Sequence, residues 1–175
     1  SADDRLPYNR PPLSKGFLRG EIEAEEDTFV HPARFYEDNV IDVRLGVEVT
    51  ALDLEGRAVV LGDGERVAYE RLVLATGATP RTPPIPGIDR AGVHLYRRLA
   101  DAAAVREEAA EARKAIVVGG SFIGCEVAAS LRMRGVEVTL VELGDRLMPA
   151  LSVPELSAQL ADLYREQGVE LVLGE

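Results

Sequence analysis

Residues 114–142 read "KAIVVGGSFIGCEVAASLRMRGVEVTLVE" and change their pattern three times. A short apolar run, 114–118, precedes a glycine-rich turn, and a helix-compatible run over 122–135 follows it. Gly135 then stands where a helix commonly ends, and 136–142 form a second apolar run closed by an acid. This order of strand, turn, helix and strand predicts a β-α-β unit with a parallel sheet.

The turn carries the spacing G-x-G-x-x-G, with Gly119, Ser121 and Gly124 at its three positions. In a dinucleotide site these positions serve a tight turn, backbone approach to the pyrophosphate and close helix packing. Ser121 departs from glycine, but its hydroxyl can donate to a phosphate. Glu142 ends the second strand, where a carboxylate binds ribose hydroxyls and favours NADH over NADPH; Arg146 nearby weakens that preference. The alternative is an α/β turn without a ligand.

Upstream of this unit the pattern alternates in short runs. The stretches 47–54, 57–61 and 66–72 predict three strands joined by glycine turns, which is a β-meander. Residues 72–75, "LVLA", form a continuous apolar run and predict a buried parallel strand. A proline-rich stretch up to Gly87 follows and suits a crossing between domains.

The remaining elements follow from periodicity and end signals. Ser152 and Glu155 predict a capping box at the start of a helix. Leu156, Leu160 and Leu163 predict the apolar stripe of that helix. The expected elements are helices over 31–39, 97–114 and 152–168, and a strand over 169–173.

Composition limits the classes of partner. The 175 residues are 46% hydrophobic and 29% charged, which is typical of a globular chain. The net charge of −10 argues against nucleic acid, and no apolar run approaches a membrane span. His31, His94 and the single cysteine, Cys125, are isolated, so no metal site is predicted. One cysteine forms no internal disulfide, and the cytoplasm is the simplest setting.

Three stretches occur in an order that identifies a family: "LPYNRPPLSKGFLRG", "LVLATGATPR" and "VVGGSFIGCEVAASLRMRGVEVTLVE". They resemble the FAD-dependent pyridine nucleotide-disulfide oxidoreductase superfamily, in its ferredoxin and rubredoxin reductase branch. The resemblance implies an α/β fold, with residues 1–92 as the central part of an FAD-binding domain that includes the β-meander. Residues 93–175 then form the first half of a Rossmann-like NAD(H)-binding domain. It also implies a piece of a longer protein that lacks the N-terminal FAD-binding β-α-β unit and the C-terminal part.

The resemblance places Lys15 beside the flavin ring and Glu126 facing the nicotinamide. We expect the two side chains to pair across the domain boundary until NADH enters. Without the resemblance they would be a surface lysine and a glutamate favoured by the dipole of a helix start. The implied FAD contacts are Lys15, Val49, Ala75, Thr76, Gly77 and Arg97. The implied NAD contacts are Gly119, Gly120, Ser121, Phe122, Ile123, Gly124 and Glu142.

Cysteine usage narrows the expected reaction. Disulfide reductases of the superfamily relay electrons through two neighbouring cysteines, and residues 1–60 contain none. We therefore expect hydride transfer from NADH to FAD, then electron transfer to a ferredoxin- or rubredoxin-type iron–sulfur protein. Cys125 is predicted to be a buried packing residue, because free cysteines are often buried.

Two alternatives stay open. One is an NADH oxidase or a nitrite-reductase flavoprotein component. The other belongs to a different class, an isolated nucleotide-binding or structural module without turnover. By itself the chain is expected to be inactive, and the open sheet edges of a partial domain predict pairing between chains.

Overall fold

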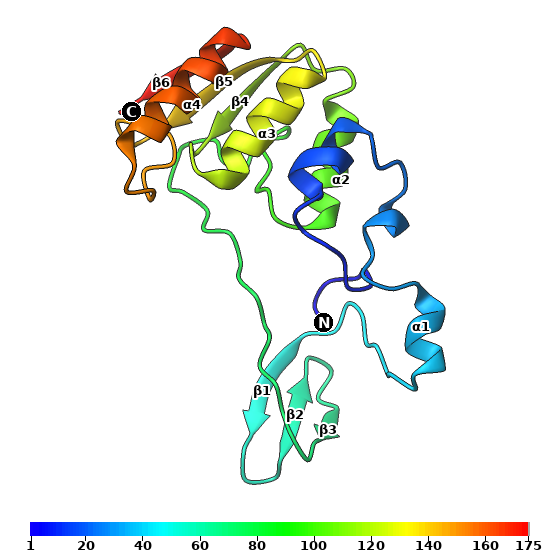
Figure 1. Cartoon of the computed structure of the whole chain (residues 1–175). Helices are drawn as coiled ribbons and strands as arrows, with labels where there is room; N and C mark the ends of the chain where they lie inside the picture. Colours follow the sequence, from blue (N-terminus) through cyan, green and yellow to red (C-terminus); the bar gives the residue numbers. More distant parts are fainter. Residues whose placement is uncertain (175) are drawn as a thin grey trace. The chain divides into compact units, whose positions relative to one another are not determined.

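The computed structural model describes residues 1–174, which form two compact units. One unit joins Ser1–Tyr8 to Phe29–Thr79, and the other joins Asn9–Thr28 to the chain from Pro80 onward (Figure 1). This division differs from the boundary expected at residue 92, because the 9–28 segment packs with the later part of the chain. The assignment of FAD and NAD domains stays a prediction.

The first unit is built on an antiparallel sheet of three strands, β1 (Val49–Asp53), β2 (Ala58–Leu61) and β3 (Arg66–Ala68). The strand order β1-β2-β3 confirms the predicted β-meander. Helix α1 (Ala33–Asp38) lies within the predicted helix over 31–39 and begins directly after Pro32.

The predicted strand over residues 72–75 is wrong. The structure has no strand there, and Val73 and Leu74 are 84% and 66% exposed. A continuous apolar run forms a parallel strand only where neighbouring strands and covering helices accept it. The sheet of the first unit is antiparallel and its last strand ends at Ala68, so it offers no such place.

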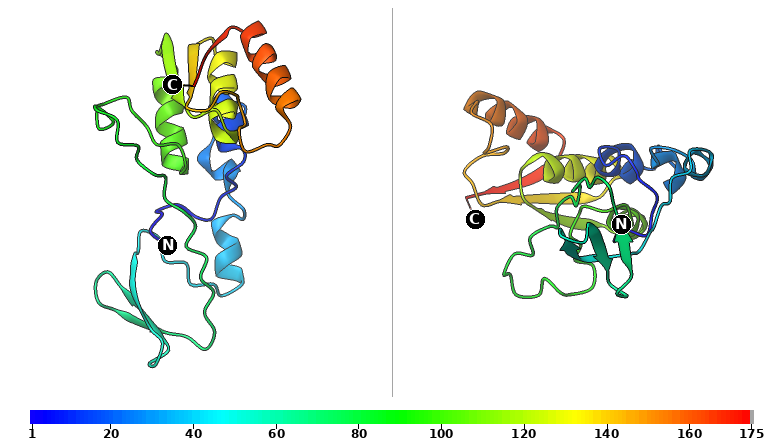
Figure 2. Two further views of the ribbon diagram at one scale, coloured as in Figure 1. Left: turned by 90° about the vertical axis from the view of Figure 1, so that its left-hand side faces the viewer. Right: turned by 90° about the horizontal axis from the view of Figure 1, so that it is seen from below.

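The second unit contains the parallel sheet that the β-α-β pattern predicts. Its strands β4 (Lys114–Val118), β5 (Glu137–Glu142) and β6 (Val169–Leu173) lie in the order β4-β5-β6. Helices α3 (Phe122–Met133) and α4 (Pro154–Glu166) cover one face of this sheet (Figures 1 and 2). The core between them includes Ala128, Leu131, Val138, Leu140 and Val169.

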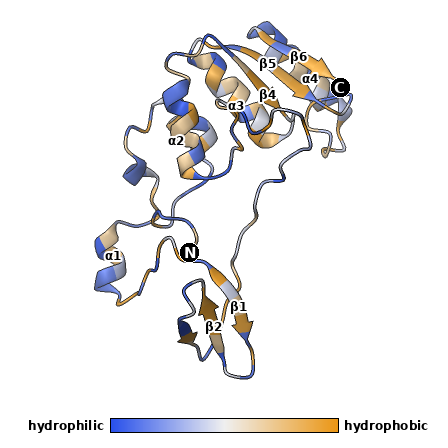
Figure 3. Cartoon of the chain, turned by 180° about the vertical axis from the view of Figure 1, so that it is seen from behind, coloured by the Kyte–Doolittle hydropathy of each residue, from blue (hydrophilic) through white to orange (hydrophobic). Residues whose placement is uncertain are grey.

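The other face of this sheet mixes apolar and polar side chains, among them Thr139, which donates to the Glu170 carboxylate. Viewed from behind, the strands lie in front of α3 and α4 (Figure 3). On β4, Ile116 and Val118 are 72% and 66% exposed. None of the helices described for residues 1–174 is long and apolar enough to cross a bilayer.

Helix α4 departs from the prediction in two respects. It begins at Pro154, and no side chain caps it, so the capping box of Ser152 is wrong. A proline suits the first helical position because its missing N–H is not needed there. The buried face carries Ser157 and Ala161, whereas Leu156 and Leu163 are about half exposed. Small side chains let the helix lie close to the sheet; only Leu160 of the predicted stripe packs against the core.

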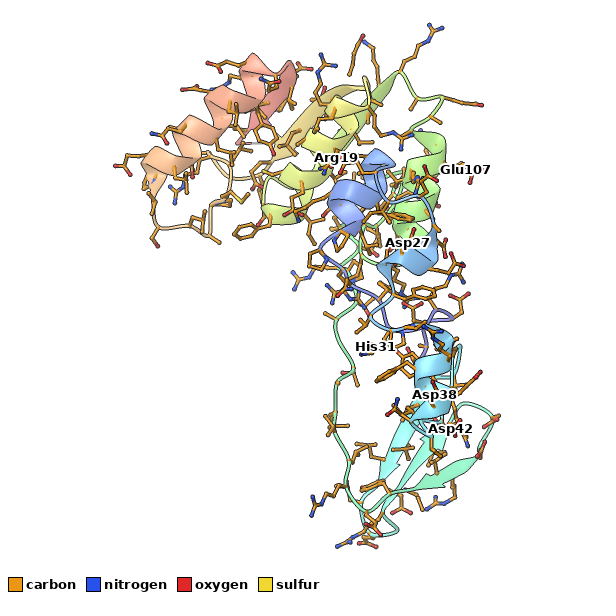
Figure 4. The ribbon with its side chains drawn as sticks, turned by 45° about the vertical axis from the view of Figure 1, so that its right-hand side comes forward. Arg19, Asp27, His31, Asp38, Asp42 and Glu107 are labelled. Atoms are coloured by element: carbon orange, nitrogen blue, oxygen red, sulfur yellow. The ribbon has the colours of Figure 1, made fainter. Side chains whose placement is uncertain are left out.

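Helix α2 (Leu99–Glu108) is shorter than the predicted helix over 97–114. Its start is fixed by the Asp101 carboxylate, which accepts hydrogen bonds from the backbone N–H groups of Arg97 and Arg98. Helix α2 contacts the 9–28 segment, in which residues 13–17 form a π-type turn (η1, Leu13–Phe17) and 25–28 a 3-10 turn (η2, Glu25–Thr28). Figure 4 marks this segment by Arg19 and α2 by Glu107.

Candidate functional site

The glycine turn between β4 and α3 has the geometry of an anion-binding site. Gly119 adopts a φ of +109°, which side chains rarely tolerate. A Cβ on Gly124 would lie 1.7 Å from the Gly119 carbonyl oxygen, so only glycine permits this close approach. Helix α3 therefore starts immediately against the strand end. The Ser121 side chain does not cap the helix, which leaves its first N–H groups and the Ser121 hydroxyl available to a ligand.

Glu142 is fixed at the end of β5 beside this turn. One carboxylate oxygen, Oε2, accepts the N–H of Gly120 at 2.5 Å, and the other, Oε1, accepts the N–H of Gly144 at 2.8 Å. Gly120 is held in turn by the N–H of Met148, which donates to its carbonyl at 2.7 Å. Each carboxylate oxygen keeps a second lone pair for an incoming donor such as a ribose hydroxyl.

Arg146 folds back on its own loop. It is half-buried, and its Nη2 donates to the carbonyl of Pro149 at 3.3 Å. Within residues 1–174, no hydrogen bond or ion pair joins it to Glu142.

Lys15 and Glu126 meet although 111 positions separate them in the sequence. Lys15 Nζ lies 2.7 Å from Glu126 Oε1, with the lysine side chain 44% and the glutamate side chain 30% exposed. Nζ also donates to the carbonyl of Pro11 at 3.2 Å. The pair forms within the second compact unit, because the 9–28 segment packs there.

The sequence did not predict three hydroxyl groups that surround this pair. Ser14 Oγ donates to Glu126 Oε2 at 2.5 Å. Ser130 Oγ donates to the carbonyl of Ser14 at 2.6 Å, and the Tyr96 hydroxyl donates to the carbonyl of Leu13 at 2.7 Å. Burial strongly raises the pKa of Tyr96, so the hydroxyl keeps its proton. The only signal in the sequence was positional: Ser14 precedes Lys15, and Ser130 lies one helical turn beyond Glu126.

A pocket of about 320 Å³ opens beside the pair. It brings together five of the predicted site residues, namely Lys15, Arg97, Phe122, Ile123 and Glu126. Phe122 and Ile123 are 54% and 47% exposed, so the first turn of α3 gives the pocket an apolar wall. An apolar wall with a few charged groups is the composition expected of a cofactor pocket.

The remaining predicted FAD contacts belong to the first unit. Val49 lies on β1 and is 50% exposed, and Ala75, Thr76 and Gly77 are exposed in irregular chain. Their contacts with FAD stay predictions.

Cys125 has the structure of a packing residue, as predicted. It is 1% exposed, and its Sγ donates to the carbonyl of Gly120 at 3.4 Å. Burial raises the pKa of its thiol to about 11, so the reactive thiolate is scarce at neutral pH. Its own carbonyl accepts the Tyr164 hydroxyl at 2.7 Å, which ties α3 to α4. Residues 1–174 contain no cluster of histidine, cysteine and acidic side chains that could hold a metal ion.

The chain is similar to known proteins over nearly its whole length. Rhodocoxin reductase of Rhodococcus erythropolis is 36% identical over 168 residues, which are 96% of this chain and 39% of that protein. The solved ferredoxin reductase of Rhodopseudomonas palustris matches 99% of this chain with a TM-score of 0.90 and 33% identity, over 42% of its own length. A water-forming NADH oxidase from Lactobacillus brevis matches with the same TM-score at 28% identity, over 40% of its length.

The chain thus spans about two fifths of the length of these relatives. The family model described as pyridine nucleotide-disulphide oxidoreductase matches all of residues 1–175. The glycine turn, the fixed Glu142 and this match lead to one conclusion: the chain belongs to the pyridine nucleotide-disulphide oxidoreductase family.

Proposed function

We propose that the chain is part of an FAD-dependent NADH oxidoreductase that passes electrons to a ferredoxin- or rubredoxin-type protein. The observation that carries the proposal is the Lys15–Glu126 pair in a pocket at the start of α3, the helix that follows the dinucleotide turn. The names of a rhodocoxin reductase and a ferredoxin reductase among the similar proteins support it. In this proposal residues 1–92 serve FAD and residues 93–175 serve NAD(H).

The turn residues bind the adenosine and pyrophosphate of NADH. The free N–H groups at the start of α3 and the Ser121 hydroxyl donate to the phosphates, and the helix dipole favours their negative charge. Glu142 accepts hydrogen bonds from the ribose hydroxyls and repels a 2′-phosphate, so NADH is preferred to NADPH. Its two backbone donors prevent the carboxylate from turning away to relieve that repulsion.

The nicotinamide end of NADH enters the pocket beside Glu126. Phe122 and Ile123 give the ring an apolar surface, and the Glu126 carboxylate accepts the N–H of the nicotinamide carboxamide. Lys15 leaves this carboxylate as NADH enters. The lysine then supplies a positive charge beside the place where negative charge develops during hydride transfer.

The residues present fit a flavin at one edge of this pocket, because a lysine cation and the apolar side chains of Leu13 and Phe122 line the same space. Lys15 and Arg97 would contact the ring, and Val49 with Ala75, Thr76 and Gly77 would contact the rest of FAD. A bound FAD supplies the hydride acceptor and releases electrons one at a time. A cytoplasmic location is part of the proposal and rests on the single cysteine.

An NADH oxidase is the second candidate, because the Lactobacillus brevis oxidase has the same fold over this chain. Two observations favour the ferredoxin-type reductase. Residues 1–60 contain no cysteine, and Cys125 is buried with a raised pKa, so neither offers a redox thiol.

The test uses the full-length protein. We expect a yellow protein whose flavin absorbance bleaches on anaerobic addition of NADH, and faster reduction of an iron–sulfur acceptor than of oxygen. A flavin-free protein would favour the nucleotide-binding or structural module, and faster reduction of oxygen would favour the oxidase.

A matched pair of variants tests the role of Lys15. Lys15→Met should slow the bleaching of the flavin absorbance by about ten-fold or more, because it removes a positive charge that stabilises the transition state. Lys114→Met is the control, since Lys114 is 79% exposed and paired with Glu137 at 3.1 Å on the far end of β4. Equal rates in both variants would remove Lys15 from the mechanism.

A further inference from the structure

We propose that Ser14 is the residue that positions Glu126 to receive the nicotinamide carboxamide. This inference rests on the proposed function, because it assigns the support of a carboxylate that faces NADH. It is based on the two carboxylate oxygens of Glu126, which have different partners. Oε1 faces Lys15 Nζ at 2.7 Å, and Oε2 accepts the Ser14 hydroxyl at 2.5 Å.

The two partners differ in how firmly they hold the carboxylate. Lys15 is long and 44% exposed, and ion pairs in such positions contribute at most about 1 kcal/mol. Ser14 is 5% exposed and has one rotatable bond before its hydroxyl. A hydrogen bond to a charged acceptor is stronger than one between neutral groups, and burial strengthens it further. Lys15 is therefore the partner that NADH displaces, and Ser14 is the partner that remains.

Ser14 is itself fixed by contacts from helix α3 and from the loop that precedes α2. Ser130, 1% exposed on α3, donates to the Ser14 carbonyl, and Tyr96 donates to the carbonyl of Leu13. Glu126 and Ser130 lie four residues apart on one face of α3, so the helix that carries the carboxylate also holds the backbone of its donor. The distance between Ser14 and Glu126 is thus set by three short hydrogen bonds, one of them buried and the other two partly buried.

These contacts have a consequence for substrate recognition. With Oε2 held by Ser14, the Glu126 carboxylate keeps one orientation after Lys15 leaves, and Oε1 points its free lone pairs into the pocket. A primary amide can donate an N–H to this oxygen. An acetyl group of nearly the same shape cannot, so Ser14 should set the preference for the carboxamide over the acetyl group.

The test measures binding without turnover, with the full-length protein. Calorimetric titrations give dissociation constants for NAD⁺ and for its 3-acetylpyridine analogue, in which an acetyl group replaces the carboxamide. In the wild type we expect NAD⁺ to bind about ten-fold more tightly than the analogue, the effect of one hydrogen bond to a charged group. Ser14→Ala should reduce this ratio to about two-fold or less, chiefly by weakening the binding of NAD⁺, because the Glu126 carboxylate then lacks its fixed orientation.

Two further variants separate positioning from folding. Ser157→Ala removes an equally buried serine, on α4, whose Oγ has no hydrogen-bond partner within the described chain, and it should leave the ratio unchanged. Ser14→Cys leaves no space unfilled but offers only a weak donor, so it should lower the ratio even where Ser14→Ala destabilises the protein.

Three outcomes would overturn the inference. An equal loss of affinity for both ligands in Ser14→Ala and Ser14→Cys would mean that Ser14 has a structural role alone. An unchanged ratio in both variants would mean that Lys15 or another group orients Glu126. If the wild type bound NAD⁺ and the analogue equally well, the carboxamide N–H would have no part in recognition. A wild type that binds neither ligand would contradict the proposed function itself, which distinguishes that failure from the others.

Discussion

Replacing Gly124 by alanine offers the sharpest test of the turn, because general helix propensity and this structure predict opposite signs. Gly124 is the third residue of α3, and glycine in a helix costs roughly 0.5–1 kcal/mol relative to alanine. Propensity alone therefore predicts that Gly124→Ala stabilises the protein. The structure predicts a loss, since the new Cβ would meet the Gly119 carbonyl oxygen at 1.7 Å.

The size of the loss follows from that contact. Real Cβ atoms essentially never approach closer than 3.0 Å, so the helix start must move by at least 1.3 Å, the difference between 3.0 and 1.7 Å. Both partners belong to the backbone, and no flexible side chain can yield. Overpacking of this kind costs about 3 kcal/mol. For a chain of 175 residues that lowers the Tm by roughly 6–12 °C.

Thermal unfolding followed by circular dichroism measures the effect, and Gly135→Ala is the matched control. Gly135 has a φ of +87°, and apart from the residues on either side of it no atom of residues 1–174 lies within 4 Å of the position that an alanine methyl would take. Alanine there meets backbone strain of about 1–2 kcal/mol without overlap. Gly124→Ala should be the less stable variant, and it should also lose NADH binding because the anion site moves. A Gly124→Ala protein as stable as the wild type would disprove the overlap.

Two predictions concern the neighbouring residues. In fluorescence titrations, Glu142→Ala should raise the dissociation constant for NADH about ten-fold and that for NADPH much less. An equal rise in both dissociation constants would show that Glu142 does not bind the ribose hydroxyls. Cys125→Ala should leave electron transfer intact, and in the wild type the folded thiol should react with thiol reagents far more slowly than the unfolded one. Because burial raises the folded-state pKa from 9.0 to about 11, the unfolded chain loses its proton first. Stability should therefore decline from about pH 9 to pH 11, and Cys125→Ala should flatten that decline; an unchanged pH profile would contradict the burial argument.

Sequence reasoning succeeded where the signal is local. Gly119 and Gly124 fix the backbone of the turn, and Gly135 ends the helix, within one stretch of chain. The apolar runs of β4 and β5 and the helical run between them depend on neighbouring residues only. The burial of Cys125 followed from the general tendency of free cysteines to lie in cores.

It failed where a local pattern needed a distant partner. Residues 72–75 have the composition of a buried strand but pair with nothing in residues 1–174. On α4 the leucine stripe looked like the buried face, whereas contact with the sheet selects the small residues Ser157 and Ala161. Hydrophobicity alone does not specify how closely two elements approach.

Local sequence was enough to determine the β-α-β unit, the glycine turn and the acid at the strand end, because backbone conformation and periodicity are encoded within a few neighbouring residues. Lys15 and Glu126 could be named only through resemblance to a family. It took the folded chain to reveal that Ser14, Ser130 and Tyr96 surround them. Ser14 and Glu126 are 112 residues apart, and their hydrogen bond exists because the 9–28 segment packs on α3. Such contacts depend on how segments far apart in the sequence pack together, and no short stretch of the chain predicts that packing.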